Sequence, residues 1–316
     1  MDLISSTLAS TRLTSSLLAT LSLSAPWSID FMSASGAPAH YVISGEAWVE
    51  SDIADPLLLS AGDLVMFPRW NRHVLSSKLG ELPESIHNLP LKLGQAPWQP
   101  GDMLDQPLHV FWGGGGESTE ILSMNFQLEN ADKSPLLLGL PRLIILRKND
   151  ARMSKGIQPV LEFLSEETNA KEAGYGVAAN RLAELLFVQI VRAQILMRPQ
   201  ELSGWLRGLS DPAIGAALGA MSERPLHRWT VAELAVVSGM SRSSFAARFT
   251  SKVGTTPLDY FTEHRMRLAA EWLIAGNSTK AVAERLGYAT PFAFTKAFQR
   301  IFGDTPGRYA RAHRTA

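Results

Sequence analysis

The 316-residue chain contains no cysteine, little charge and no long apolar run. Without cysteine it can form no disulfide, thiolate zinc site, cysteine nucleophile or thiol redox switch, and this composition fits a reducing compartment. Its longest apolar stretch is interrupted by Pro141 and Arg142, short of the ~18 residues that a membrane span requires. The N-terminal segment has an acidic residue, Asp2, at its second position and lacks the basic segment of a signal peptide. We therefore expect a cytoplasmic protein with no membrane partner.

Charged residues make up only 19% of the chain, and Lys plus Arg balance Asp plus Glu at 30 each. The balance hides an uneven distribution. From Asp211 onward there are 14 Lys/Arg and 8 Asp/Glu, a net +6, which leaves 16 and 22, a net −6, in the preceding residues. A basic C-terminal third on an acidic remainder is typical of a nucleic-acid-binding module joined to a second domain. At ~150 residues per domain, the length also predicts about two domains.

Short runs of aliphatic and aromatic residues, separated by Gly, Pro and Asp, fill the chain from about residue 15 to residue 147. Such runs predict an antiparallel sandwich or barrel. They lie at residues 27–31, 40–43, 47–49, 57–59, 64–67, 121–128 and 143–146. Between Pro83 and Thr119, five prolines, four consecutive glycines, Trp98 and Trp112 predict one long loop across a sheet face.

After Asp150 the apolar spacing becomes helical. Residues 157–164 and 177–197 place Leu, Ile and Val three and four positions apart, and Pro199 ends the second helix. The apolar face of that helix fits packing within the chain and packing on a second copy equally well. We expect residues 1–150 to form a sensor domain, residues 151–210 a helical dimerisation or linker segment, and residues 211–316 a separate helical domain.

An internal repeat identifies the C-terminal third. Five residue types recur 49 positions later in the chain. The first copy contains Phe245, Phe249, Gly254, Pro257 and Tyr260, and the second contains Phe294, Phe298, Gly303, Pro306 and Tyr309. Each copy reads as a short helix, a glycine turn at Gly239 or Gly287, and a second helix capped by Ser241 or Thr290. This order is the signature of a helix-turn-helix unit.

Helical spacing divides the faces of the two second helices. The phenylalanine pairs stand four residues apart and must turn inward, so the intervening positions face outward, where a major groove would meet them. The predicted DNA-binding residues are Arg242, Ser243, Ala246, Ala247, Arg248, Pro291, Phe292, Thr295, Lys296 and Arg300. Of these, Arg248 and Arg300 are expected to contact phosphates or solvent rather than bases.

Residues 257–276 connect the two copies as one helix of about 18 residues, or roughly 27 Å at 1.5 Å per residue. One DNA turn spans ~34 Å, so both units could enter successive major grooves on one face of a duplex.

The stretch from Asp211 to Arg311 resembles the DNA-binding domain of the AraC/XylS-type transcriptional regulators. The resemblance rests on the run from Ala283 to Tyr288, followed by Phe294, Lys296, Ala297, Phe298, Arg300, Phe302, Gly303, Pro306 and Tyr309. It implies a seven-helix pair of helix-turn-helix units that binds two tandem boxes in double-stranded promoter DNA, and a regulator, mainly an activator, that works with RNA polymerase. The family often has a long polar residue where this chain has Ala246 and Ala247, which predicts weaker sequence reading by the first unit.

Two segments of the N-terminal domain, His40 to Glu46 and Gly62 to His73, resemble the two motifs of a cupin barrel. The whole chain is therefore similar to AraC-type regulators with an N-terminal cupin, and its fold class is α+β: an antiparallel β-barrel, a helical segment and an all-α domain with two helix-turn-helix units. Metal-binding cupins supply His, His and Glu in the first motif and His in the second. Here His40, Glu46 and His73 align, but Val42 replaces one histidine, so we expect neither a bound metal nor another cofactor.

An unidentified small effector is the more economical ligand, because apolar pockets with a few polar groups are the usual form of ligand sites. The candidate effector-binding residues are His40, Tyr41, Trp48, Phe67, Trp70 and His73. Three functions remain open: a ligand-sensing regulator that is not an enzyme, a metal-dependent cupin enzyme fused to a DNA-binding domain, and a nonspecific architectural DNA binder. The zero net charge disfavours the third.

Overall fold

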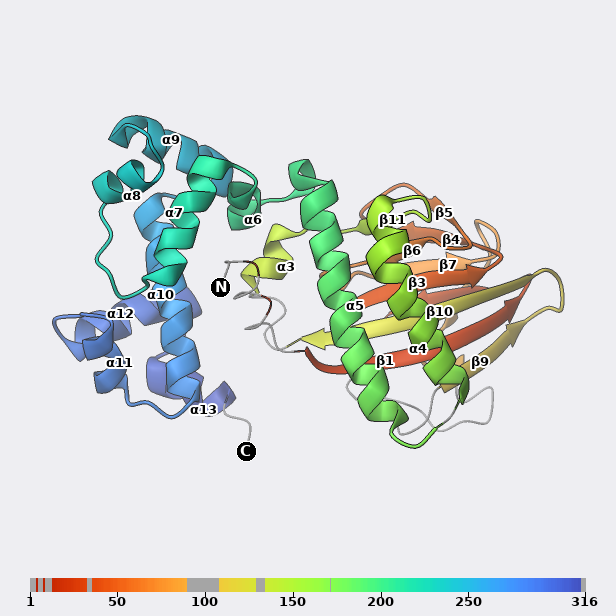
Figure 1. Ribbon diagram of the computed structural model, residues 1–316. Helices are drawn as coiled ribbons and strands as arrows, with labels where there is room; N and C mark the ends of the chain where they lie inside the picture. The colour runs from red at the N-terminus through yellow and green to blue at the C-terminus, as the bar shows by residue number, and fades with distance from the viewer. Residues whose placement is uncertain are drawn as a thin grey trace. The chain divides into compact units, whose positions relative to one another are not determined.

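The computed structural model describes residues 13–32, 36–89, 108–128, 134–170 and 172–313, together with Ile4 and Leu8. The chain divides into two compact units, and the boundary lies between Leu202 and Ser203. A β-rich unit with two long helices precedes the boundary, and a helical unit follows it (Figure 1).

The β-rich unit is built from two sheets. One has six strands in the order β11, β6, β3, β10, β1, β9, and the other has five in the order β5, β4, β7, β2, β8. The strands are β1 (Leu13–Ser24), β2 (Ser28–Phe31), β3 (Ala37–Ser44), β4 (Glu46–Ser51), β5 (Leu57–Ser60), β6 (Leu64–Met66), β7 (His73–Ser76), β8 (Glu84–Ser85), β9 (Leu108–Gly113), β10 (Ser118–Leu128) and β11 (Ile144–Leu146). The β1/β9 and β2/β8 pairs are parallel, and the other described pairs are antiparallel.

The apolar core lies between the two sheets. Alternate residues of β1, namely Ala19, Leu21 and Leu23, point into it, as strand periodicity requires. The chain passes from one sheet to the other at Gly45, where φ is +77° and a Cβ would stand 2.5 Å from the Ser118 carbonyl oxygen. Among the described strands no ladder closes the two sheets into one ring. The two sheets therefore form an open sandwich rather than the closed barrel that the sequence predicts. The turn at Gly45 places β3 in one sheet and β4 in the other.

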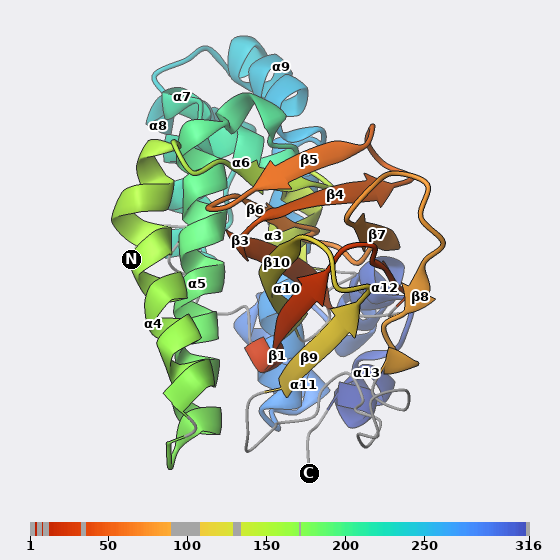
Figure 2. The ribbon, with the colours of Figure 1, turned by 90° about the vertical axis from the view of Figure 1, so that its right-hand side faces the viewer.

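Two helices cover the outer face of the six-stranded sheet (Figures 1 and 2). They are α4 (Gln158–Ala170) and α5 (Tyr175–Met197), which follow the short helix α3 (Pro135–Gly139). Phe187 of α5 meets Phe126 of β10 edge to face, with ring centroids 5.5 Å apart. Both helices predicted from apolar spacing are present, and α5 begins two residues before the predicted start at Val177.

The loop predicted between Pro83 and Thr119 was wrong in part. This segment contains β8 and also β9, which pairs in parallel with β1. The sequence Leu108-His-Val-Phe-Trp-Gly is a strand-forming run, but its neighbouring prolines and glycines concealed it. Trp98 lies outside the described residues.

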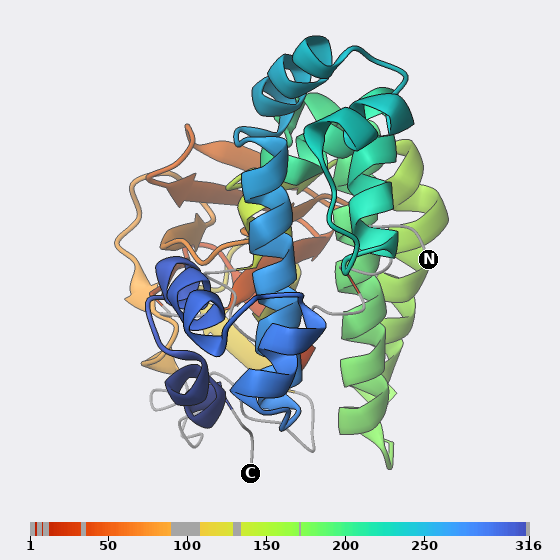
Figure 3. The ribbon, with the colours of Figure 1, turned by 90° about the vertical axis from the view of Figure 1, so that its left-hand side faces the viewer.

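The helical unit begins with α6 (Gly204–Leu209) and continues with seven further helices (Figure 3). These are α7 (Pro212–Glu223), α8 (Val231–Val237), α9 (Arg242–Val253), α10 (Pro257–Ile274), α11 (Thr279–Arg285), α12 (Pro291–Phe302) and α13 (Pro306–His313). Tyr260, in the first half of α10, packs on Phe249 of α9, whereas Met266 and Leu273, in the second half, share a core with α12. The helix α10 thus joins two packed halves. No described helix is long and apolar enough to cross a membrane.

Candidate DNA-binding surface and candidate effector site

The first helix-turn-helix pair consists of α8 and α9. Thr230 and Glu233 form a reciprocal capping box at the start of α8, with N···O distances of 3.2 and 2.8 Å. Ser241 Oγ caps α9 by accepting from the Ser244 amide at 3.3 Å. Between the helices, Gly239 has a φ of +65°, a left-handed conformation that favours glycine. Local sequence therefore specifies both the start of each helix and the turn.

The second pair, α11 and α12, repeats this construction. Ser278 caps α11, Thr290 caps α12, and Gly287 forms the turn with a φ of +72°. Pro291 occupies the first position of α12, where its missing amide hydrogen costs nothing. The internal repeat predicted two helix-turn-helix units, and the structure confirms them.

Each second helix buries one face and exposes the other. Phe245, Phe249, Phe294 and Phe298 are fully buried. The sequence-predicted DNA-binding residues lie on the opposite faces: Arg242, Ser243, Ala247, Pro291, Phe292, Lys296 and Arg300 are exposed, and Ala246 and Thr295 are partly exposed. Phe292, in the first turn of α12, leaves 78% of its surface in solvent. At the displacement of 49 residues, Ala246 and Ala247 of α9 correspond to Thr295 and Lys296 of α12.

Arg248 is also exposed, but it differs from the other predicted DNA-binding residues because it pairs with a buried carboxylate. Its Nε donates to Asp211 Oδ2 at 2.7 Å, and the Asp211 side chain is 2% exposed. Asp211 also caps α7 by accepting from the Ala213 and Ile214 amides. Burial opposes ionisation of Asp211, but the bond from Arg248 and these amides hold its pKa below the usual value. Arg248 therefore ties α9 to α7, which no local pattern indicated because 37 residues separate the partners.

Two histidines meet in the core of the β-rich unit. His40 on β3 and His73 on β7 are each 1% exposed, and their Nε2 atoms lie 2.7 Å apart. His73 Nδ1 lies 2.8 Å from the Asn71 carbonyl oxygen, and His40 Nδ1 lies 3.1 Å from Ser123 Oγ. The His73 ring stacks against Phe31 and Phe67, with centroids 5.0 and 4.2 Å away.

These contacts determine which ring nitrogen of each histidine carries the proton. Burial lowers the pKa of His73 to about 4 and also lowers the pKa of His40, so both rings are neutral at pH 7. A carbonyl oxygen only accepts, so His73 carries its proton on Nδ1 and accepts at Nε2. His40 then donates from Nε2 and accepts at Nδ1 from the Ser123 hydroxyl. The result is a fully paired chain of hydrogen bonds inside an apolar core.

The structure brings together only part of the predicted effector and metal sets. His40, Phe67 and His73 share the core, whereas Tyr41 points to the opposite face of β3. Burial, and to a smaller extent the charge of Glu162 on α4, raise the pKa of Tyr41. Trp48 alternates with the core residues Ala47 and Val49 and so faces away from the core, and Trp70 is partly buried before β7. Strand periodicity, which separates neighbours, explains this division.

A metal does not fit the candidate ligands. Glu46 is exposed at the start of β4 and accepts a hydrogen bond from Ser60, so it does not join the histidine pair. The Nε2 atoms of His40 and His73 are hydrogen-bonded to each other, so neither lone pair is directed at a common metal position. Among the described residues, no three His, Asp or Glu side chains form a metal-binding group.

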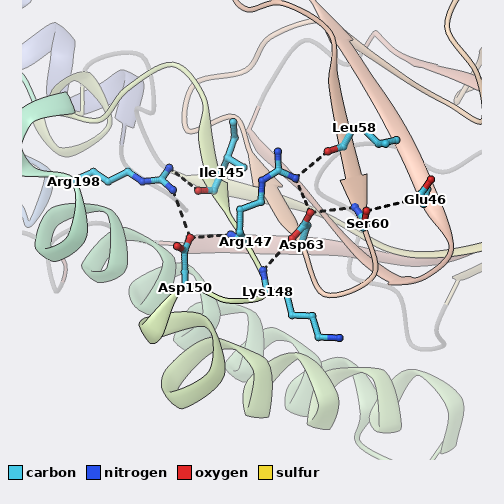
Figure 4. Close-up of polar contacts among 9 residues, drawn as sticks. All are labelled: Glu46, Leu58, Ser60, Asp63, Ile145, Arg147, Lys148, Asp150 and Arg198. Atoms are coloured by element: carbon cyan, nitrogen blue, oxygen red, sulfur yellow. Dashed lines mark hydrogen bonds and ion pairs between the residues drawn. The ribbon is translucent and has the colours of Figure 1, made fainter.

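A polar network spans one end of the β-rich unit (Figure 4). Asp63 accepts hydrogen bonds from the Ser60 and Lys148 amides and from Arg147, whose Nη1 lies 2.6 Å from Oδ2. Asp150 accepts from the Arg147 amide and pairs with Arg198, which follows α5. The network links the turn after β5 to the segment that leads out of the unit, four residues before its boundary at Leu202.

Comparison with known proteins gives the same division of the chain. Residues 2–195 match the cupin family, and residues 234–312 match a helix-turn-helix domain family. An AraC-like transcription regulator of Streptomyces lividans is 31% identical over 311 residues, which covers 98% of this chain and 97% of that protein. The chain belongs to the AraC-like transcription regulators.

Other relatives match this AraC-like regulator over most of the chain or over its helical part. RclR of Escherichia coli, an HTH-type transcriptional activator specific for RCS, is 31% identical over 251 residues and covers 79% of this chain and 86% of its own length. The DNA-binding domain of AdpA, solved with a target DNA, is 32% identical and covers 33% of this chain and 94% of that one, with a TM-score of 0.30. The relatives are named as regulators rather than as enzymes.

Proposed function

We propose that this AraC-like regulator recognises two tandem boxes in promoter DNA, with α9 and α12 entering successive major grooves. The observation that carries this proposal is the pair of exposed second-helix faces, placed on the two halves of one 18-residue helix. That helix is roughly 27 Å long, close to the ~34 Å of a DNA turn. Arg242 and Ser243 of α9, and Phe292, Thr295 and Lys296 of α12, contact base edges, and Arg300 contacts the phosphate backbone.

The test is a selection of genomic fragments with the purified chain at ~150 mM salt, since specificity depends on ionic strength. Enriched fragments are expected to carry two boxes with centres about one helical turn apart. Lys296→Ala should cost ~1 to 3 kcal/mol of binding free energy, or relax recognition at one box only. Lys78→Ala, which removes the same charge from an exposed site of the β-rich unit, is the matched control. Equal affinity for random and selected fragments would reject sequence-specific binding.

We further infer that the core around His40, Phe67 and His73 receives a small organic effector that modulates promoter binding. The support is a polar pair inside an apolar and aromatic core, the usual composition of a ligand site. Trp27 in the same core has a buried Nε1 without a hydrogen-bond partner among the described residues, so it could donate to an effector oxygen.

A thermal-unfolding screen of small aromatic and aliphatic acids and alcohols tests the effector site. A binder should raise the unfolding temperature of the intact chain, and Trp27→Phe, which removes only the donor, should weaken its binding by about tenfold. Trp205→Phe, a change of the same kind in the helical unit, is the control. An effector that binds equally to the Trp27→Phe chain would remove Trp27 from the site.

The regulator is proposed to act as a homodimer and to activate transcription with RNA polymerase. Large apolar side chains on α4 and α5 remain in solvent: Phe163 is 52%, Val177 65% and Leu196 54% exposed. The activating sign follows the name of its relative RclR. Analytical ultracentrifugation should show a dimer that Val177→Glu converts to a monomer, whereas Val236→Glu on α8, which is also exposed, should leave the dimer intact.

A further inference from the structure

Two arginines converge on the turn of the second helix-turn-helix pair. Arg228 precedes α8, and its Nη2 donates to the Gly287 carbonyl oxygen at 2.8 Å. Arg265, from α10, donates through Nη2 to the adjacent Leu286 carbonyl oxygen. We call Arg228 and Arg265 the arginine pair.

The Leu286 and Gly287 carbonyl groups lie at the C-terminal end of α11. The last carbonyl groups of a helix have no amide of a following turn to bind. The Gly287 and Tyr288 amides already close this end by donating to Glu284 and Ala283. The carbonyls of Leu286 and Gly287 therefore remain available at the negative end of the helix dipole, where guanidinium groups bind favourably. Gly287 is favoured by its φ of +72°, and a Cβ there would stand 3.3 Å from Arg228 Nη2.

The two arginines come from different parts of the domain. Arg228 belongs to the first half, since the neighbouring Trp229 is buried, donates to the Arg224 carbonyl and lies beneath the Arg224 guanidinium. Arg265 is half-buried in the connecting helix, between the rings of Phe261 and Tyr288. The bond from Arg228 thus joins the first half directly to the second, in addition to the connection through α10.

We propose that the bond from Arg228 to the second turn determines which spacing between the two DNA boxes the regulator accepts. This proposal rests on the tandem recognition proposed above. If α10 were the only connection, the two halves could bend or rotate relative to each other about this helix. The bond from Arg228 to the Gly287 carbonyl restricts that motion. One added base pair moves a box by about 3.4 Å and rotates it by about 35°, so a restricted pair of recognition helices rejects it. Arg228 is then a positioning residue that contacts no base.

The first experiment measures spacing selectivity with the full chain. Affinities are compared for selected DNA with the native box spacing and for the same DNA with one base pair added or removed. Arg228→Ala should reduce the ratio between native and altered spacing by about tenfold, the equivalent of one charged hydrogen bond. Arg228→Lys, which keeps one donor, should restore part of it. Arg207→Ala on α6 removes an exposed arginine from the same unit and should leave the ratio unchanged.

Two outcomes would overturn the proposal. An Arg228→Ala chain with the selectivity of the original chain would show that the bond does not set the spacing. An equal loss of affinity at every spacing would show that Arg228 contacts phosphate or only stabilises the fold.

A second experiment needs no DNA, so it separates this proposal from the proposed function. Because the chain has no cysteine, Ser251→Cys on α9 and Gln299→Cys on α12 give two unique sites for spin labels at exposed positions. The distance distribution between the labels should be narrow in the original chain, broader after Arg228→Ala, and narrow again after Arg228→Lys. An unchanged distribution would contradict the restricting role of Arg228, whereas failure of the original chain to select tandem boxes would contradict the proposed function alone.

Discussion

At the scale of single residues, the buried histidines show how burial assigns protons. Two imidazoles in an apolar core would each pay a large cost for a positive charge, and both find neutral partners instead. The order Ser123, His40, His73, Asn71 fixes one tautomer on each ring. An apolar substitution at either histidine would leave a buried donor or acceptor unpaired.

We expect both rings to remain neutral at pH 5.5. Because burial lowers both pKa values below that of an unfolded histidine, the unfolded state binds more protons, and stability falls as the pH decreases through about 6.5 towards the folded pKa. Long-range ¹H–¹⁵N spectra should show a proton on Nδ1 of His73 and on Nε2 of His40. His73→Gln identifies the signals, and an imidazolium pattern at pH 5.5 for either ring would contradict the assignment.

Phe292 is expected to contact the methyl group of a thymine in the second box. Replacing that thymine by uracil removes only the methyl group, and affinity should fall about fourfold, the equivalent of one buried carbon. Phe292→Ala should abolish the difference between thymine and uracil, and Phe292→Leu should keep part of it. Lys296→Ala serves as the control, because it should lower affinity without changing that difference. A uracil penalty that persists in Phe292→Ala would assign the methyl contact to another residue.

At the scale of elements, Asp63 connects strands that are distant in sequence. It bonds its own turn through Ser60 and the end of β11 through Arg147 and Lys148. Burial opposes its ionisation, but the Lys148 and Ser60 amides and the Arg147 guanidinium lower its pKa below the usual value. One carboxylate therefore holds the six-stranded sheet's edge against the turn after β5.

Asp63→Asn should lower the free energy of unfolding of the β-rich unit by about 2 kcal/mol at pH 7, because hydrogen bonds to a charged acceptor are the stronger ones. Since the folded pKa is lowered, this difference is complete above pH ~4 and disappears as the pH falls through the folded pKa. Urea unfolding at pH 7, 5 and 3 measures it. Asp55→Asn, an exposed aspartate in the preceding turn, is the control and should change little. Equal effects of both substitutions would contradict the role of Asp63.

At the scale of the whole molecule, the chain separates charge between its two units. From Ser203 onward there are 15 Lys/Arg and 8 Asp/Glu, against 15 and 22 in the preceding residues. Because phosphate contacts release counterions, the excess of cations assigns the salt dependence of DNA binding to the helical unit.

We therefore expect a fragment of residues 203–316 and the full chain to give the same slope of log affinity against log salt concentration on one selected DNA. A difference of less than about one unit corresponds to less than about one phosphate contact. Circular dichroism of the fragment is the control for folding. A steeper slope for the full chain would show that the β-rich unit also contacts phosphates.

The helical unit could be predicted from the sequence in its two helix-turn-helix pairs, but α6 lies inside the expected linker of residues 151–210. Its caps and turns are local, so Ser241, Thr290 and Gly287 indicate helix ends without reference to the rest of the fold. The phenylalanine pairs four residues apart also determine which face is buried. The β-rich unit was less accessible: β1, whose serines and threonines alternate with apolar residues, was not recognised as one long strand, and β9 was hidden between prolines and glycines.

The candidate sites divide in the same way. Helical periodicity placed the exposed residues of α9 and α12, because faces repeat within a few residues. It did not show that Arg248 pairs with Asp211, that Tyr41 lies away from His40, or that Arg228 reaches Gly287. By itself, then, the sequence determined the family and the two helix-turn-helix pairs, because these depend on short-range spacing. Only the tertiary structure decided the histidine pair, the Asp63 network and the arginine pair, because their partners meet only after the chain has folded.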